Sequence, residues 1–74
     1  MTKSQAATIE QLVLDGHVVT MDSGPYVHEF ATVWNQDGEP WIKNNVLSSQ
    51  PLRNVPADDV TVFKKVEWKG IHSS

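Results

Sequence analysis

Four side chains in the first half of the chain are of the types that bind metal ions or transfer protons. They are His17, Asp22, His28 and Glu29. Adjacent residues on a strand point to opposite faces, so His28 and Glu29 could join one cluster only across a bulge. Two histidines and carboxylates without a characteristic spacing do not form a metal motif. No serine lies in a nucleophile elbow, and the glycines form no phosphate-binding loop. The sequence therefore predicts a protein that is not an enzyme, with no catalytic residues, metal or cofactor.

Aromatic and basic residues alternate near the C-terminus, from Phe63 to Lys69. A strand of this kind can follow a nucleic-acid backbone and stack bases. The same pattern is typical of an edge strand whose Val and Trp side chains are buried while its lysines extend to water. We favour the edge strand and keep nucleic-acid binding as the alternative, with these residues as its candidates: Lys64, Lys65, Trp68 and Lys69.

Charge is unevenly distributed along the chain, whose net charge is −3. Residues 1–40 carry one lysine and six acidic residues, whereas residues 41–74 carry five basic and three acidic residues. A sign difference between two halves can mark a charged partner, although both halves can also simply face solvent. The overall acidity argues against nucleic acid as the main partner, because that binding depends on Lys and Arg at phosphates.

The segment from Tyr26 to Ile42 predicts a β-hairpin. Residues from Tyr26 to Trp34 alternate with a period of two, and Asn35-Gln36-Asp37-Gly38 follows as a turn. Gly38 can adopt the positive φ that a type I turn plus bulge requires. Both faces of the first strand are apolar, and 74 residues can scarcely cover both. We therefore expect one face to remain uncovered and to bind a partner.

The predicted partner-binding surface combines this spare apolar face with the tryptophan that follows the turn and two acidic hairpin residues. Its members are Val27, Ala31, Val33, Trp41, Asp37 and Glu39. Tryptophan is enriched at binding hot spots, which favours Trp41 as an anchor. Trp34 is expected in the core, because large aromatic residues dominate small cores.

The first fifteen residues allow two interpretations. As a helix from Ser4 to Leu14, Thr2 is the N-cap, Gln5 completes a capping box, and Gly16 ends the helix. The apolar face then holds Ala6, Ile9 and Val13, with Leu12 beside it. As a hairpin, Asp15-Gly16 is the turn. We favour the helix, because the segment lacks strand alternation.

The sequence thus predicts one small α+β domain over residues 1–74. Its helix packs on three or four antiparallel strands: His17–Asp22, Tyr26–Trp34, Trp41–Lys43 and Val60–Trp68. A long irregular loop is expected at 44–58, either functional or laid over the core, and a polar tail at 70–74. If Asp15-Gly16 is a hairpin turn, the fold becomes an all-β, SH3-like small barrel.

We expect a cytoplasmic, non-enzymatic module that binds another protein and inhibits or adapts it. Residues 1–15 lack the apolar core of a signal peptide, no run approaches the ~20 residues of a membrane span, and cysteine is absent. A homodimer that buries the spare face is compatible with this function. In size and composition, though not in motif, the chain resembles accessory proteins of phages and mobile elements and small bacterial regulators.

Overall fold

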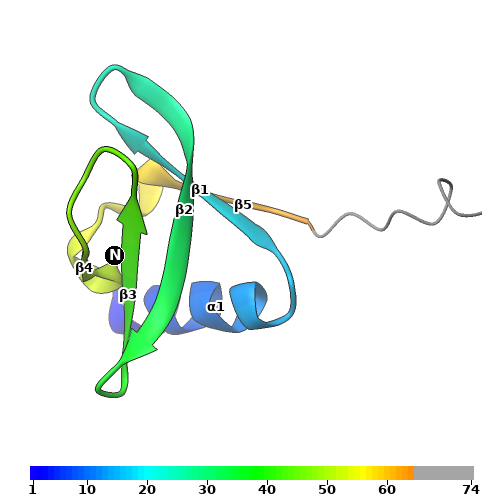
Figure 1. Ribbon diagram of the computed structural model, residues 1–74. Coiled ribbons are helices and arrows are strands. Elements are labelled where there is room, and N and C mark those ends of the chain that lie inside the picture. Colours follow the sequence, from blue (N-terminus) through cyan, green and yellow to red (C-terminus); the bar gives the residue numbers. More distant parts are fainter. Residues whose placement is uncertain (65–74) are drawn as a thin grey trace, which may run out of the picture.

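A computed structural model describes residues 1–64, which form one helix packed on a five-stranded antiparallel sheet (Figure 1). The elements are α1 (Lys3–Leu14), β1 (Val18–Ser23), β2 (Tyr26–Gln36), β3 (Glu39–Asn44), β4 (Gln50–Pro51), the 3₁₀ turns η1 (Leu52–Asn54) and η2 (Ala57–Asp59), and β5 (Val60–Phe63). The strand order is β4-β3-β2-β1-β5. The predicted α+β class is confirmed, with one strand more than expected, and the N-terminal segment is helical rather than a hairpin.

Local chemistry defines both ends of α1. The Thr2 hydroxyl accepts a hydrogen bond from the Gln5 amide at 3.1 Å, and the Gln5 side chain accepts one from the Thr2 amide at 2.9 Å. This is the predicted capping box. At the other end Gly16 has φ +96°, and His17 N–H donates to the Leu12 carbonyl at 3.0 Å. These are features of a Schellman motif, which ends the helix at the predicted glycine.

Two tight hairpins connect the three central strands. Between β2 and β3, Asp37 and Gly38 have φ of +54° and +83°, and Gln36 pairs with Glu39. Two residues of positive φ correspond to a type I′ turn. The predicted positive φ of Gly38 is confirmed, whereas the turn is shorter than the predicted type I turn plus bulge. Between β1 and β2, Gly24 has φ +62° and precedes Pro25, which matches a type II′ turn.

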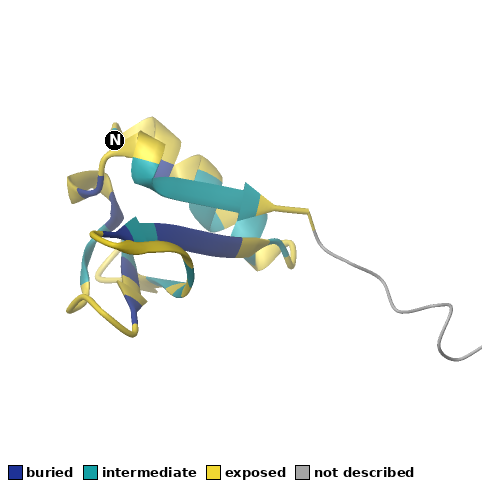
Figure 2. Cartoon of the chain, turned by 90° about the horizontal axis from the view of Figure 1, so that it is seen from above, coloured by how far each residue is buried: buried dark blue, intermediate teal, exposed yellow. Residues whose placement is uncertain are grey.

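The core lies between α1 and one face of the sheet. Six apolar side chains form its fully buried part: Ala6, Val19, Met21, Ile42, Leu52 and Val55. On α1, Ile9 and Val13 pack against this cluster, as the predicted apolar face requires. Figure 2 shows β1 as a largely buried strand, as expected for a strand flanked by β2 and β5.

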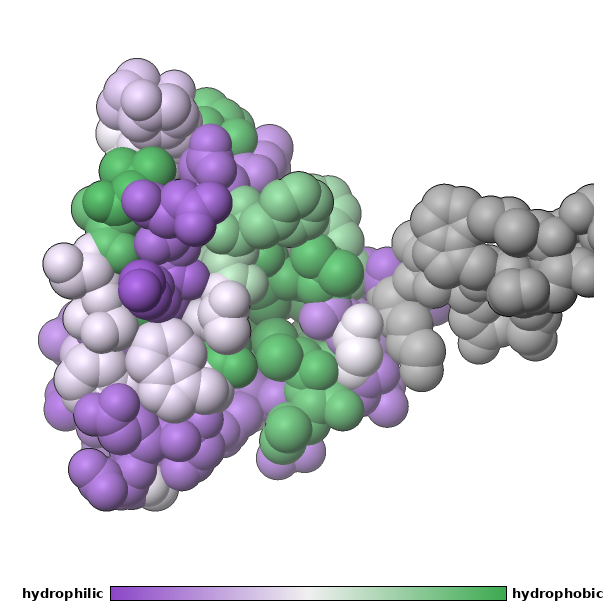
Figure 3. Space-filling view, viewed as in Figure 1, coloured by the Kyte–Doolittle hydropathy of each residue, from purple (hydrophilic) through white to green (hydrophobic). Residues whose placement is uncertain are grey.

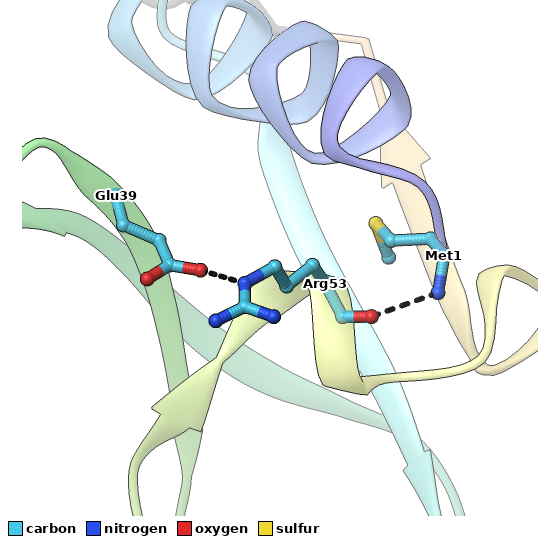
Figure 4. Close-up of polar contacts among 3 residues, drawn as sticks. All are labelled: Met1, Glu39 and Arg53. Atoms are coloured by element: carbon cyan, nitrogen blue, oxygen red, sulfur yellow. Dashed lines mark hydrogen bonds and ion pairs between the residues drawn. The ribbon is translucent and has the colours of Figure 1, made fainter.

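The predicted irregular loop contributes to the core. Leu52 and Val55 are 0% and 3% exposed, so this segment lies over the core, which was one of the two expectations for it. The ammonium group of Met1 donates to the carbonyls of Arg53, at 3.1 Å, and of Val55. The Arg53 side chain forms an ion pair with Glu39 (Figure 4). These contacts attach η1 to the start of α1 and to β3.

Candidate protein-binding surface on the sheet

The sheet has an inner face covered by α1 and an outer face on the opposite side. Strand register assigns residues to each face, because directly opposed residues of antiparallel strands point the same way. Val19, Met21 and Ile42 belong to the core and define the inner face. Their neighbours along β1, β2, β3 and β5 define the outer face, which includes Val18, Thr20, Phe30, Thr32, Trp34, Trp41, Lys43, Thr61 and Phe63.

Exposed apolar side chains gather on this outer face. Phe30, on the central strand β2, is 73% exposed, Phe63 is 45% exposed, and Val18 is 41% exposed. Val18 lies directly opposite Phe63, while Phe30 lies opposite Thr20. Figure 3 shows apolar side chains in groups over the strands and beside the end of α1, while polar side chains cover the β2–β3 hairpin end. Exposed apolar side chains that lie close together on one face are typical of an interaction surface.

A β-bulge shapes the outer face between β1 and β2. Met21 pairs with Glu29 and Ser23 with Tyr26, so two β2 residues, Val27 and His28, stand opposite one β1 residue. His28 adopts φ +56°. Its amide donates to the carboxylate of Asp22 at 3.0 Å. Such bulges re-aim side chains, and here the bulge determines where the His28 ring lies.

The His28 ring covers part of the outer face. Its Nδ1 lies 3.3 Å from the Thr20 hydroxyl, and its ring meets Phe63 edge to face with centroids 5.9 Å apart. Thr20 is only 3% exposed, although α1 covers the opposite face. Thr20 is therefore buried at the base of the outer face, and the side chains of His28, Phe30 and Phe63 project beyond it.

Two tryptophans extend the outer face toward β4. Trp34 and Trp41 are opposed across β2 and β3, and Trp41 also pairs with Pro51 of β4. Both indole side chains are half-buried. Trp34 donates from Nε1 to the Gln36 side chain at 3.4 Å. The expectation that Trp34 belongs to the core is therefore wrong, because it lies on the face opposite the helix.

The face of β2 that was predicted to be uncovered is the inner face, which α1 covers. Ala31 and Val33 pack against the core beneath α1, so the expectation that they lie uncovered is wrong. The physical reason is the position of the helix, whose Ala6 is 2% exposed against the sheet. Small side chains suit such a closely approached face. Val27 is 65% exposed at the bulge, apart from Ala31 and Val33.

The predicted acidic residues lie at the β2–β3 hairpin end. Asp37 is an exposed residue of the turn itself. Glu39 is half-buried and paired with Arg53, so an internal cation compensates its charge. Glu10 on α1 accepts a hydrogen bond from the Asn35 side chain at 3.0 Å, which fixes the helix beside this hairpin end. The hairpin end thus has a structural role whether or not it contacts a partner.

The residues of the nucleic-acid alternative fall mostly outside residues 1–64. Lys64 is exposed and directly follows β5, which is an edge strand as predicted. The other three, Lys65, Trp68 and Lys69, lie outside the described residues, as does the second half of the strand predicted at Val60–Trp68. Within residues 1–64, Lys43 is the lysine that strand register places on the outer face.

The outer-face residues that sequence reasoning missed are Val18, Phe30 and Phe63, with His28 beside them. One signal was present, since Phe30 alternates in phase with Thr32 and Trp34 and is the largest apolar residue near the middle of β2. The alternating side chains of β2 form two sets, one on each face of the sheet. The face on which α1 packs decides which of the two sets stays uncovered. That contact joins distant parts of the chain and leaves no local pattern.

Comparisons with protein-family models, curated proteins and solved structures gave no match. Over residues 1–64, no group of three or more His, Cys, Asp or Glu side chains is arranged to hold a metal ion. In the same part of the chain, no helix is long and apolar enough to cross a membrane.

A groove of about 440 Å³ lies between α1, the β2–β3 hairpin end and η1. It is lined by side chains of both signs and by small apolar residues: Lys3, Ala6, Ala7, Glu10, Glu39 and Arg53. Glu39 and Arg53 neutralise one another, and Glu10 is bonded to Asn35. The charged groups of Glu39, Arg53 and Glu10 are therefore already bonded within the chain.

Proposed function

We propose that this chain is a non-enzymatic protein-binding module that contacts its partner with the outer face of the sheet, as an inhibitor or adaptor would. One observation carries the proposal: Phe30, on the central strand β2, is 73% exposed. Removing a phenylalanine ring of this exposure from water gives about 2 kcal/mol, which an interface can use. Trp41, half-buried on the same face, is the second anchor.

The arrangement of this face supports a protein partner. Interface centres combine aromatic anchors with surrounding residues that exclude water, and Thr20, Thr32 and Val18 surround Phe30 here. β2 is paired along its length, with β1 from Tyr26 to Ala31 and with β3 from Ala31 to Gln36. Because the anchors sit on paired strands, binding requires little ordering of the backbone.

Single-stranded nucleic acid is the alternative partner. Phe30, Phe63 and Lys43 lie on the same face of the sheet. This arrangement favours the alternative, because aromatic rings on a sheet can stack bases. Charge argues against it. Residues 1–64 contain four lysine or arginine residues and eight aspartate or glutamate residues, a net charge of −4. Such a surface repels phosphates overall.

Affinity capture from native lysate, with and without nuclease, separates the two classes of partner. The bait is the wild-type chain, and the comparison bait carries Trp41→Ala. A protein that remains bound after nuclease treatment and binds the variant at least about tenfold less supports the proposal. Loss of all binding with nuclease, together with a steep fall in binding as salt rises, would replace it with the nucleic-acid alternative.

A further inference from the structure

The open edge of β5 has unused backbone hydrogen-bonding groups. β5 is the last strand of the sheet and bonds to β1 along one side, and no strand within residues 1–64 pairs with its other side. Soluble proteins usually protect such edges with charges, prolines or bulges. The four residues of β5, Val60-Thr61-Val62-Phe63, contain none of these.

Charges of opposite sign flank this edge strand. Asp58 and Asp59 precede β5 in η2, and Asp58 is exposed. Lys64, also exposed, follows it, and the sequence continues with Lys65. Antiparallel pairing reverses one strand relative to the other, so the beginning of each strand meets the end of its neighbour. A strand with one acidic and one basic end is therefore complementary to a second copy of itself.

We propose that β5 pairs antiparallel with β5 of a second copy of this chain, which joins the two sheets into one. A two-fold axis perpendicular to the sheet keeps both helices on the same side, and opposed residues then share a face. With Thr61 on the axis, Val60 lies opposite the partner's Val62, and Asp58 lies opposite the partner's Lys64. With Val62 on the axis, the register of the pair is shifted toward the basic end, and the acidic end of each strand again meets the basic end of the other.

The side chains of β5 fit this pairing. Val60 and Val62 are half-buried and pack against the core on the inner face. With Thr61 on the axis, each of them meets its valine counterpart across the new strand pair. Phe63 stays on the outer face, so the two outer faces lie side by side. This inference does not depend on the proposed function, since β5 pairing uses backbone groups at the edge and leaves Phe30 uncovered. Two four-residue strands bury only a small surface area when they pair. The dimer is therefore expected to be weak, so its population depends on protein concentration.

Charge reversal with complementation tests the proposal. One variant carries Asp58→Lys and Asp59→Lys, so both ends of its strand are basic; the other carries Lys64→Asp and Lys65→Asp, so both are acidic. Sedimentation velocity over roughly 5 to 500 µM measures the dimerisation constant of each chain and of their equimolar mixture. Circular dichroism confirms that each variant is folded.

We expect a wild-type dimer, a dimer at least about tenfold weaker for each variant alone, and recovery of dimerisation in the mixture. Recovery shows directly that acidic and basic ends meet. If one variant does not fold, salt titration of the wild type serves instead, and the dimer should weaken as salt rises. A wild-type chain that stays monomeric throughout the range, or a dimer that tolerates both reversals, would overturn the proposal.

Discussion

Asn44 at the end of β3 determines how the chain leaves the sheet, and its replacement by alanine should be strongly destabilising. Its side chain is 4% exposed. The amide nitrogen donates to the Ser23 hydroxyl at 2.6 Å, and the amide oxygen accepts from the backbone N–H groups of Val46 and Leu47 at 3.0 and 2.7 Å. These three bonds connect β1, β3 and the following loop, which leads to the buried Leu52.

The size of the effect follows from these three bonds. Each contributes about 1 kcal/mol net, so Asn44→Ala should lower the free energy of unfolding by about 3 kcal/mol. A chain of this size is stable by roughly 4–11 kcal/mol, so the loss is a large share of the total. The melting temperature should fall by about 12–24 °C.

Urea unfolding followed by circular dichroism measures this change, with two matched variants. Ser23→Ala removes one bond and should lose about 1 kcal/mol. Asn45→Ala, at the exposed neighbouring position, should change stability by less than about 0.5 kcal/mol. If Asn44→Ala were no more destabilising than Asn45→Ala, the assignment of Asn44 as the residue that fixes this loop would be refuted.

Three further predictions test the fold. Ala31→Glu should destabilise by about 3 kcal/mol or more because it places a charge beneath α1, whereas Thr32→Glu, one residue away on the outer face, should be tolerated; equal melting temperatures would disprove the assignment of faces. Gly38→Val should lose roughly 1–2 kcal/mol through strain alone, since no atom lies within 4 Å of its added Cβ, while Gly38→Asn should be nearly neutral. Acetylation of the Met1 amine should lower the free energy of unfolding by about 1–2 kcal/mol, because an ammonium that donates to two carbonyls becomes an amide with one N–H. An unchanged urea midpoint would mean that these bonds contribute nothing to stability.

Features set by neighbouring residues could be predicted from the sequence. The capping box of Thr2 and Gln5 and the helix end at Gly16 depend on side chains within one turn of the backbone groups they serve. The positive φ of Gly38 follows from the Asp-Gly pair in the same way. Each of these signals is local, so no knowledge of distant contacts was needed.

Features set by distant contacts could not be predicted in this way. Both phases of β2 are apolar, so only the docking of α1 decides that Ala31 is covered and Phe30 is not. Strand β4 is two residues long and contains Pro51, which gives no alternating pattern. The bulge at His28 depends on the register between β1 and β2. The sequence therefore predicted an uncovered apolar face on β2 but assigned it to the residues that α1 covers, Ala31 and Val33.

The affinity of the captured partner for two matched variants tests the central claim, that the outer face of the sheet is the binding surface. Phe30→Ser removes the most exposed ring of that face, and Leu14→Ser removes an equally exposed side chain (74%) at the end of α1. Isothermal titration with the purified partner should show that Phe30→Ser weakens binding by about tenfold or more, because truncating an anchor residue costs at least ~2 kcal/mol. Leu14→Ser should bind as the wild type does. Unchanged binding by Phe30→Ser, or an equal loss with Leu14→Ser, would contradict the account.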